Sequence, residues 1–204
     1  MDWTKPISIE NNTAITYLIG SMEAPADNDG GVGWRQLFTP KLNERGIYAF
    51  DPTFEEKKKI GMPTAEFMEK LNELVLDERW KEFLSEMRKI WKGRTYLQVI
   101  NFKKVMVHIL GDIQYVESSK FLVWHHKEGD KPGGTIVELV IAWLHGIPVY
   151  LVTEMPLIKM NKSILYFLLD SGHEQGRVFK TFDQLLSFLD EKYQFALKPI
   201  DTKK

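Results

Sequence analysis

Short apolar segments alternate with amphipathic stretches along most of this chain. Four segments are typical of buried strands: AITYLIG (14–20), IYAFDP (47–52), FLVWHH (121–126) and IPVYLV (147–152). A fifth and weaker strand is expected at the start of RVFKTF, which begins at residue 177. Apolar residues recur at helical spacing over 33–45, 135–145, 160–172 and 183–193. This alternation predicts an α/β fold with a mostly parallel sheet of about five strands.

A longer amphipathic stretch interrupts this alternation. From Pro63 to Gly93 the apolar positions form one stripe among Glu, Lys and Arg, which predicts an extra long helix. We interpret 63–93 as a helical excursion that covers one edge of the domain or builds a contact between subunits. No repeat or linker divides the chain, so 1–204 is expected to be a single domain with a frayed tail at 198–204.

Composition narrows the class of protein. Hydrophobic residues make up 44% of the 204 residues and charged residues 27%, the usual mix of a soluble globular protein. The net charge of −1 gives no general attraction for nucleic acid or anionic membranes. The chain has no cysteine, which excludes disulfides, Cys-ligated zinc and thiol nucleophiles. Without a signal-peptide pattern or a membrane-spanning apolar run, we expect a cytoplasmic protein.

Ligands of parallel sheets bind beyond the carboxyl ends of the strands, where the strand order reverses. The loops expected to form a site are therefore 20–33, 51–62, 125–135 and 152–161. The first loop contains neither GxGxxG nor GxxxxGK[ST], so the dinucleotide-binding fingerprint and the P-loop are both absent. Trp34 and Arg35 follow this loop, and an indole beside a guanidinium suits a base or a phosphate. A flexible surface turn fits the same composition.

Histidines and acids supply further candidates. His125 and His126 are adjacent on a strand and point to opposite faces, so we expect no bound metal. Asp112 follows the apolar segment VMVHIL, and Asp130 precedes the next helix. Carboxylates that converge at one site can act as nucleophile and general acid. Alternatively, Asp112 caps the following turn and Asp130 is solvated.

Glu138 is the one charged residue of PGGTIVELVIAWLHGIPV (132–149). Thr135 and Glu138 match the capping box, in which an N-cap Thr and a Glu three residues later satisfy each other's backbone donors. A carboxylate near a helix N-terminus is also kept ionised by the helix dipole and is suited to nucleophilic attack. Spacing alone leaves both interpretations open.

Several segments together resemble the nucleoside 2-deoxyribosyltransferase-like family, and more closely its phage and bacterial branch of uncharacterised members. The similarity covers about residues 14–155 and is carried by TYLIG, MEAPADNDGGVGWR, FDP, KKVMVHILGDIQYVESSKFLVWHH and GGTIVELVIAWLHGIPVYLV. The last segment is similar to the family signature GT-x-x-E-x-x-x-A-x-x-x-x-x-P-V. The long helix at 63–92 departs from the small transferases of the family.

The resemblance implies a flavodoxin-like, Rossmann-like three-layer fold, a homo-oligomer and an enzyme that cleaves or transfers at the N-glycosidic bond of a nucleoside or nucleotide. It implies that Glu138 is the nucleophile, that Asp112 handles the nucleobase and that Tyr17 positions Glu138. The other substrate-binding residues it implies are Gly20, Met22, Trp34, Asp130, Gly134, Thr135 and, toward a neighbouring subunit, Asn161. No cofactor or metal is needed. A nucleotide-binding sensor or interaction module without turnover is the alternative.

Overall fold

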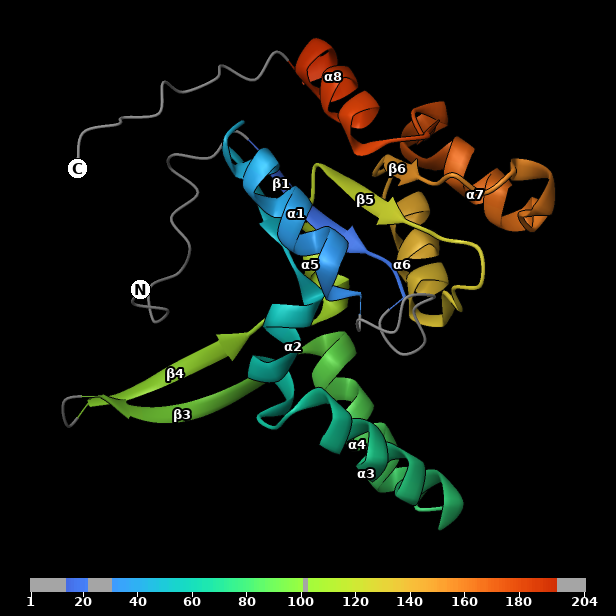
Figure 1. Cartoon of the computed structure of the whole chain (residues 1–204). Coiled ribbons are helices and arrows are strands. Elements are labelled where there is room, and N and C mark those ends of the chain that lie inside the picture. Colours follow the sequence, from blue (N-terminus) through green and yellow to red (C-terminus); the bar gives the residue numbers. More distant parts are fainter. Residues whose placement is uncertain (1–13, 22–30, 101–102, 194–204) are drawn as a thin grey trace. The chain divides into compact units, whose positions relative to one another are not determined.

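The computed structural model describes residues 14–21, 31–100 and 103–193. The chain divides into two compact units, whose helices and strands are drawn in Figure 1. We call Pro52–Tyr115 the insert unit, and the described residues of Ser8–Asp51 and Val116–Lys204 the sheet unit. The excursion predicted at 63–93 falls within the insert unit. The predicted frayed tail, 198–204, lies outside the described residues.

The sheet unit contains a five-stranded sheet in the order β2-β1-β5-β6-β7. Its strands are β1 (Ala14–Ile19), β2 (Ile47–Phe50), β5 (Phe121–His125), β6 (Val149–Val152) and β7 (Arg177–Phe179). All four pairings are parallel, which confirms the predicted α/β fold. The order along the sheet is that of flavodoxin-like folds, and it reverses between β1 and β5. The predicted strand at 147–152 begins only at Val149 because Pro148 has no N–H to donate.

Helices cover both faces of this sheet. On one face, α1 (Val32–Asn43) and α8 (Phe182–Tyr193) pack in one core with the strands, through residues such as Phe38, Leu185 and Leu18. The connections containing α6 (Gly133–Leu144) and α7 (Lys162–Glu174, after a 3₁₀ turn at Leu157–Lys159) run in the opposite direction along the sheet. Because crossovers are right-handed, these helices cover the other face. The result is the predicted three-layer arrangement.

Strand pleating decides which side chains face α6. Leu18 of β1 and Val123 of β5 are paired in register, and both belong to the core of α1 and α8. Their neighbours must point to the opposite face, because side chains alternate along a strand. Tyr17 and Trp124 therefore lie on the α6 side of the sheet, and both are buried.

The insert unit contains the helices α2 (Pro52–Ile60), α3 (Thr64–Leu76) and α4 (Trp80–Lys92), the strands β3 (Arg94–Ile100) and β4 (Lys103–Ile109), and the start of α5 (Asp112–Glu117). The loop predicted at 51–62 is wrong, since most of it is α2. Pro52 is the first helical residue, a position where its missing N–H costs no hydrogen bond. The antiparallel pair β3–β4 was not resolved by the sequence pattern either.

The single long helix predicted at 63–92 is also wrong. The chain breaks between α3 and α4, where Glu78 takes a left-handed conformation with φ of 54°. Folding back lets Phe83 and Met87 of α4 pack on a small core that contains Phe67 and Leu71 of α3. A straight helix of the same residues would leave both halves of the apolar stripe uncovered.

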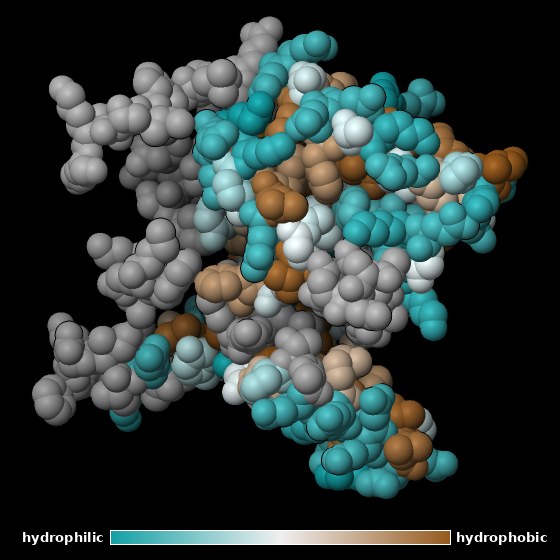
Figure 2. All heavy atoms as spheres, in the orientation of Figure 1, coloured by the Kyte–Doolittle hydropathy of each residue, from teal (hydrophilic) through white to brown (hydrophobic). Residues whose placement is uncertain are grey.

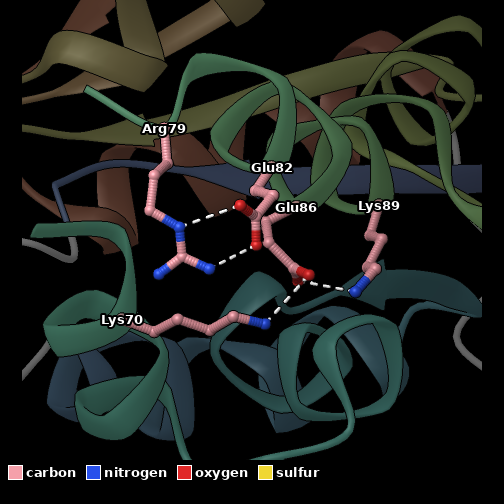
Figure 3. Close-up of polar contacts among 5 residues, drawn as sticks. All are labelled: Lys70, Arg79, Glu82, Glu86 and Lys89. Carbon is pink, nitrogen blue, oxygen red and sulfur yellow. Dashed lines mark hydrogen bonds and ion pairs between the residues drawn. The ribbon is translucent and has the colours of Figure 1, made fainter. Parts of the chain in front are cut away.

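Ion pairs join α3 and α4 on their polar side (Figure 3). Glu86 of α4 accepts from Lys70 of α3 at 2.9 Å and from Lys89 at 2.6 Å. Burial opposes ionisation of Glu86, but hydrogen bonds from Lys89 and Lys70 hold its pKa below the usual value. Arg79 contacts Glu82 with two hydrogen bonds near the helix break. The α3–α4 hairpin is therefore stabilised by ion pairs on its polar side and by apolar packing on its other side.

Near the free end of this hairpin, hydrophobic side chains remain exposed, and Figure 2 shows them at the surface. They are Val75, Leu76, Trp80 and Leu84.

Candidate functional site

Arg35 fixes the backbone at the carboxyl end of β1. Its side chain is fully buried and donates to the carbonyl oxygens of Leu18 (3.2 Å), Gly20 (3.2 Å) and Gly31 (2.5 Å). Its Nε also lies 3.8 Å from Oδ1 of Asp51. The guanidinium thus holds together the chain that leaves β1 and the chain that enters α1. The buried guanidinium is engaged with the backbone here, and the hypothesis that Arg35 meets a base or phosphate stays a prediction.

Gly20 and Trp34, both predicted site residues, lie together at this strand end. A Cβ on Gly20 would stand 3.1 Å from the carbonyl oxygen of His125 and 3.5 Å from the Trp34 ring. The Trp34 ring stacks on Phe182 of α8 at 5.7 Å and contacts the His125 ring at 5.2 Å. The predicted first loop therefore does meet the end of β5. Phe182, more than 140 residues away in the sequence, could not have been assigned from the pattern.

A cleft of about 580 Å³ opens beyond the carboxyl ends of β5, β6 and β7, a size typical of small-molecule sites. It is lined by His125, His126, Lys127, Glu128, Val152, Thr153, Glu154, Met155, Pro156, Lys180, Thr181 and Phe182. His125 and Phe182 supply aromatic surface, and Lys127 and Lys180 supply cations. Glu128 is paired with Lys159 at 2.6 Å. The cleft therefore suits a flat ligand that also carries polar or anionic groups.

Two buried polar atoms at the end of β5 make no hydrogen bond with the described part of the chain. They are Nε1 of Trp124 and Nδ1 of His126, whose rings lie 5.3 Å apart. An unsatisfied buried polar group costs about 1–3 kcal/mol, so each one calls for an explanation such as a bound water, an ion or a ligand. His126 also lines the cleft. From the sequence, His126 was a candidate only as a metal ligand, and nothing in the pattern singled out Trp124.

Asp130 lies in the turn after β5 and contacts this region. Its Oδ2 accepts from the backbone N–H of Lys127 at 2.8 Å and stands 3.6 Å from Nδ1 of His126. Burial lowers the pKa of His126, and the nearby carboxylate of Asp130 opposes that shift only in part. The imidazole is therefore biased toward its neutral form. The alternative that Asp130 is merely solvated is wrong, since the residue is half-buried and closes the turn.

The capping-box interpretation of Thr135 and Glu138 is wrong. The N-cap of α6 is Pro132, no side chain caps the helix, and the N–H of Ile136 already donates to the carbonyl of Pro132 at 3.0 Å. Two glycines, at 133 and 134, thus extend the helix before Thr135. Apart from its chain neighbours and its own helix backbone, no described atom lies within 4 Å of a Cβ built on Gly134, another predicted site residue.

Glu138 instead lies on the inward face of α6. The buried positions Thr135, Glu138, Leu139 and Ala142 follow the i, i+3, i+4, i+7 spacing of one helix face. Glu138 is 8% exposed and belongs to the second turn, near the positive end of the helix dipole. Tyr17, 1% exposed, points to the same side of the sheet. Glu138 is not among the residues that line the cleft, and its role as nucleophile stays a prediction.

Asp112 belongs to the insert unit, whereas Tyr17 and Glu138 belong to the sheet unit. Its carboxylate forms an ion pair with Lys59, and both side chains are buried. Nζ of Lys59 lies 4.9 Å from the ring centroid of Tyr115. Sequence inspection missed Lys59, which is one of three consecutive lysines and carries no pattern of its own. The joint action of Asp112 and Glu138 stays a prediction.

Two predicted substrate-binding residues, Met22 and Asn161, remain. Met22 lies outside the described residues. Asn161 is the N-cap of α7, and its Oδ1 accepts from the N–H groups of Ser163 (2.9 Å) and Ile164 (3.4 Å). This capping role explains Asn161 locally. Its implied role toward a neighbouring subunit stays a prediction.

Among the described residues, no group of three or more His, Asp or Glu side chains is arranged to hold a metal ion. Over the same ranges, no helix is both long and apolar enough to cross a membrane. Comparison with models of known protein families and with characterised proteins found no match to this sequence.

Proposed function

We propose that this protein is an enzyme that cleaves or transfers at the N-glycosidic bond of a nucleoside or nucleotide. The observation that carries the proposal is the position of Glu138, a buried carboxylate on the inward face of α6, the helix that follows β5 at the reversal of strand order. Ligands of such sheets bind at this reversal. The sequence resemblance assigns the nucleophile to the same residue.

In this mechanism an oxygen of Glu138 attacks the anomeric carbon of the sugar. The C–N bond breaks, the base leaves with the bonding electrons, and it takes up a proton as it departs. A glycosyl ester of Glu138 remains. Water or a second base then attacks the same carbon from the opposite side, which releases the carboxylate and retains the configuration. The cleft beyond β5, β6 and β7 offers aromatic surface from His125 and Phe182 that suits a flat base.

The test is base release or exchange, followed by chromatography, over a panel of deoxynucleosides and 5′-nucleotides with and without a free acceptor base. Glu138→Gln should lower kcat at least about a thousandfold because it removes the nucleophile. The matched control, Glu174→Gln, changes an exposed residue of α7 and should retain activity. With a 2-fluoro sugar analogue, mass spectrometry should detect an adduct on Glu138.

Two results would refute the proposal. One is a wild-type protein that is inactive over the whole panel, and the other is a Glu138→Gln variant as active as wild type.

A second function, nucleotide binding without turnover, is favoured by one observation. The carboxylate of Asp112, the residue implied to handle the base, is already engaged by the buried Lys59. An ionised carboxylate only accepts hydrogen bonds, so it can bind an N–H group of a base but not protonate the base. Under this function, nucleotides raise the melting temperature of the protein without forming product.

We also propose that the chain forms a homo-oligomer through the outer side of α6 and α7. Helix α6 is apolar all round, and its one charged residue, Glu138, faces inward. A helix of this kind is normally buried on every side. Yet Val137 and Leu144 of α6 are exposed, as are Tyr166 and Leu169 of α7. The second copy would cover these four side chains.

A further inference from the structure

One segment of the chain carries basic residues and no acidic ones. Between Arg88 and Ile109 lie six of its 27 Lys and Arg residues and none of its 28 Asp and Glu residues. The net charge of −1 conceals this segregation. The segment comprises the end of α4 and the strands β3 and β4, all in the insert unit. A local basic surface of this kind attracts polyanions whatever the net charge of the protein.

The two strands form a ribbon that pairs with no other described strand. β3 and β4 are antiparallel over seven residue pairs, from Arg94–Ile109 to Ile100–Lys103. Figure 1 shows the ribbon running clear of the helices of its own unit. A two-stranded ribbon by itself is only marginally stable in water, so a partner is expected. The major groove of B-form DNA is wide enough to admit such a ribbon.

Exposed side chains of the segment are suited to contact phosphates. Lys92 and Lys104 are exposed, while Lys89 is paired with Glu86 and contributes less. The guanidinium of Arg94 lies 5.2 Å from the ring centroid of Tyr96, which is itself 38% exposed. Gln98, Thr95 and His108 add exposed polar groups along both strands. Lysines and arginines clustered along one element form the electrostatic footprint typical of nucleic-acid surfaces.

The positive charge of the ribbon also argues against a second copy of this chain as its partner. Pairing two such ribbons edge to edge would bring together segments that carry only positive charge. Exposed lysines on edge strands are a common means of preventing that association. The partner must therefore be negatively charged.

We propose that the β3–β4 ribbon, with Lys92 at the end of α4, binds double-stranded DNA through its phosphates. The binding is independent of sequence and of the proposed glycosidic chemistry. Few phosphates are contacted, so the dissociation constant falls in the range of about 10⁻⁶–10⁻⁴ M that is usual for non-specific binding at physiological salt. Affinity weakens steeply as the salt concentration rises.

The experiment measures fluorescence anisotropy of a labelled duplex of random sequence with the full-length protein, between 50 and 200 mM NaCl. The wild type should bind saturably at 50 mM. The pair Lys92→Gln/Lys104→Gln should weaken binding at least about tenfold and reduce the slope of log K against log[salt] by about 2, one for each lost phosphate contact. The control pair Lys81→Gln/Lys159→Gln has the same net charge and should weaken binding less than about twofold.

Three outcomes overturn the proposal: no saturable binding at 50 mM NaCl, equal weakening by the control pair, or full competition by polyglutamate at equal charge concentration. The last outcome would identify an acidic protein as the partner. If circular dichroism shows that the double variant does not fold, the proposal is tested instead by acetylating the lysines of the wild type with and without the duplex. Bound duplex should protect Lys92 and Lys104 but not Lys81, and failure of that protection also refutes the proposal.

Discussion

Arg35 shows how one side chain can organise the start of the site. Its three hydrogen bonds to the carbonyls of Leu18, Gly20 and Gly31 satisfy acceptors that have been removed from water. Arg35→Met should therefore lower the free energy of unfolding by about 3–5 kcal/mol, measured by urea denaturation. Arg45→Met is the control, because Arg45 pairs with the partly exposed Asp190 and should cost only about 1 kcal/mol. Equal losses would show that burial of Arg35 is not decisive.

His126 predicts a pH dependence of stability. Burial lowers its pKa from the ordinary 6.5, so the unfolded chain binds the proton more readily than the folded protein does. Stability is therefore full above about pH 6.5 and falls as the pH drops below that value toward the folded-state pKa. Urea titrations between pH 5 and pH 8 should show this loss in the wild type and a smaller one in His126→Asn. His145→Asn, at an exposed position, should behave like the wild type.

At the scale of elements, the α3–α4 hairpin depends on Glu86. Glu86→Gln removes the charge that Lys70 and Lys89 share and should destabilise the protein by about 0.5–1 kcal/mol. Because the pKa of Glu86 is lowered from 4.5, its contribution is present above that pH and is lost as the pH falls through the folded-state value. The difference between wild type and variant in urea midpoint should therefore shrink at acidic pH. A difference that is unchanged by pH would contradict this account.

The hairpin also shows how a periodic pattern can predict helix without locating where one helix ends and the next begins. Phe67, Leu71 and Leu74 repeat every three or four positions, but Trp80 follows six positions after Leu74, so the apolar stripe changes phase at the break. The left-handed residue is Glu78, not a glycine or a proline, and it carries no stop signal. The break exists because the two halves of the stripe bury each other. That is a tertiary effect.

At the scale of the whole molecule, the proposed homo-oligomer makes a direct prediction. Sedimentation velocity should detect a dimer or larger species of the wild type, since exposed apolar side chains on α6 and α7 gain from burial. Leu144→Glu/Leu169→Glu should shift the protein to a monomer, because each charge would have to be desolvated in the interface. The control Leu76→Glu/Leu84→Glu alters exposed leucines of the hairpin and should leave the oligomer intact. A monomeric wild type refutes the interface.

The sequence by itself determined the class of fold. Strand periodicity and the alternation of strands with helices are local properties, and they were enough to predict an α/β fold with a mostly parallel sheet. The three-layer arrangement was what the family resemblance implied. Sequence also singled out Glu138, Gly20 and Trp34. Only the tertiary structure decided what surrounds them, because burial and contacts depend on residues distant in the chain. In the folded chain Glu138 lies on the inward face of α6, and Arg35 donates hydrogen bonds to backbone carbonyls. Asp112 forms an ion pair with Lys59.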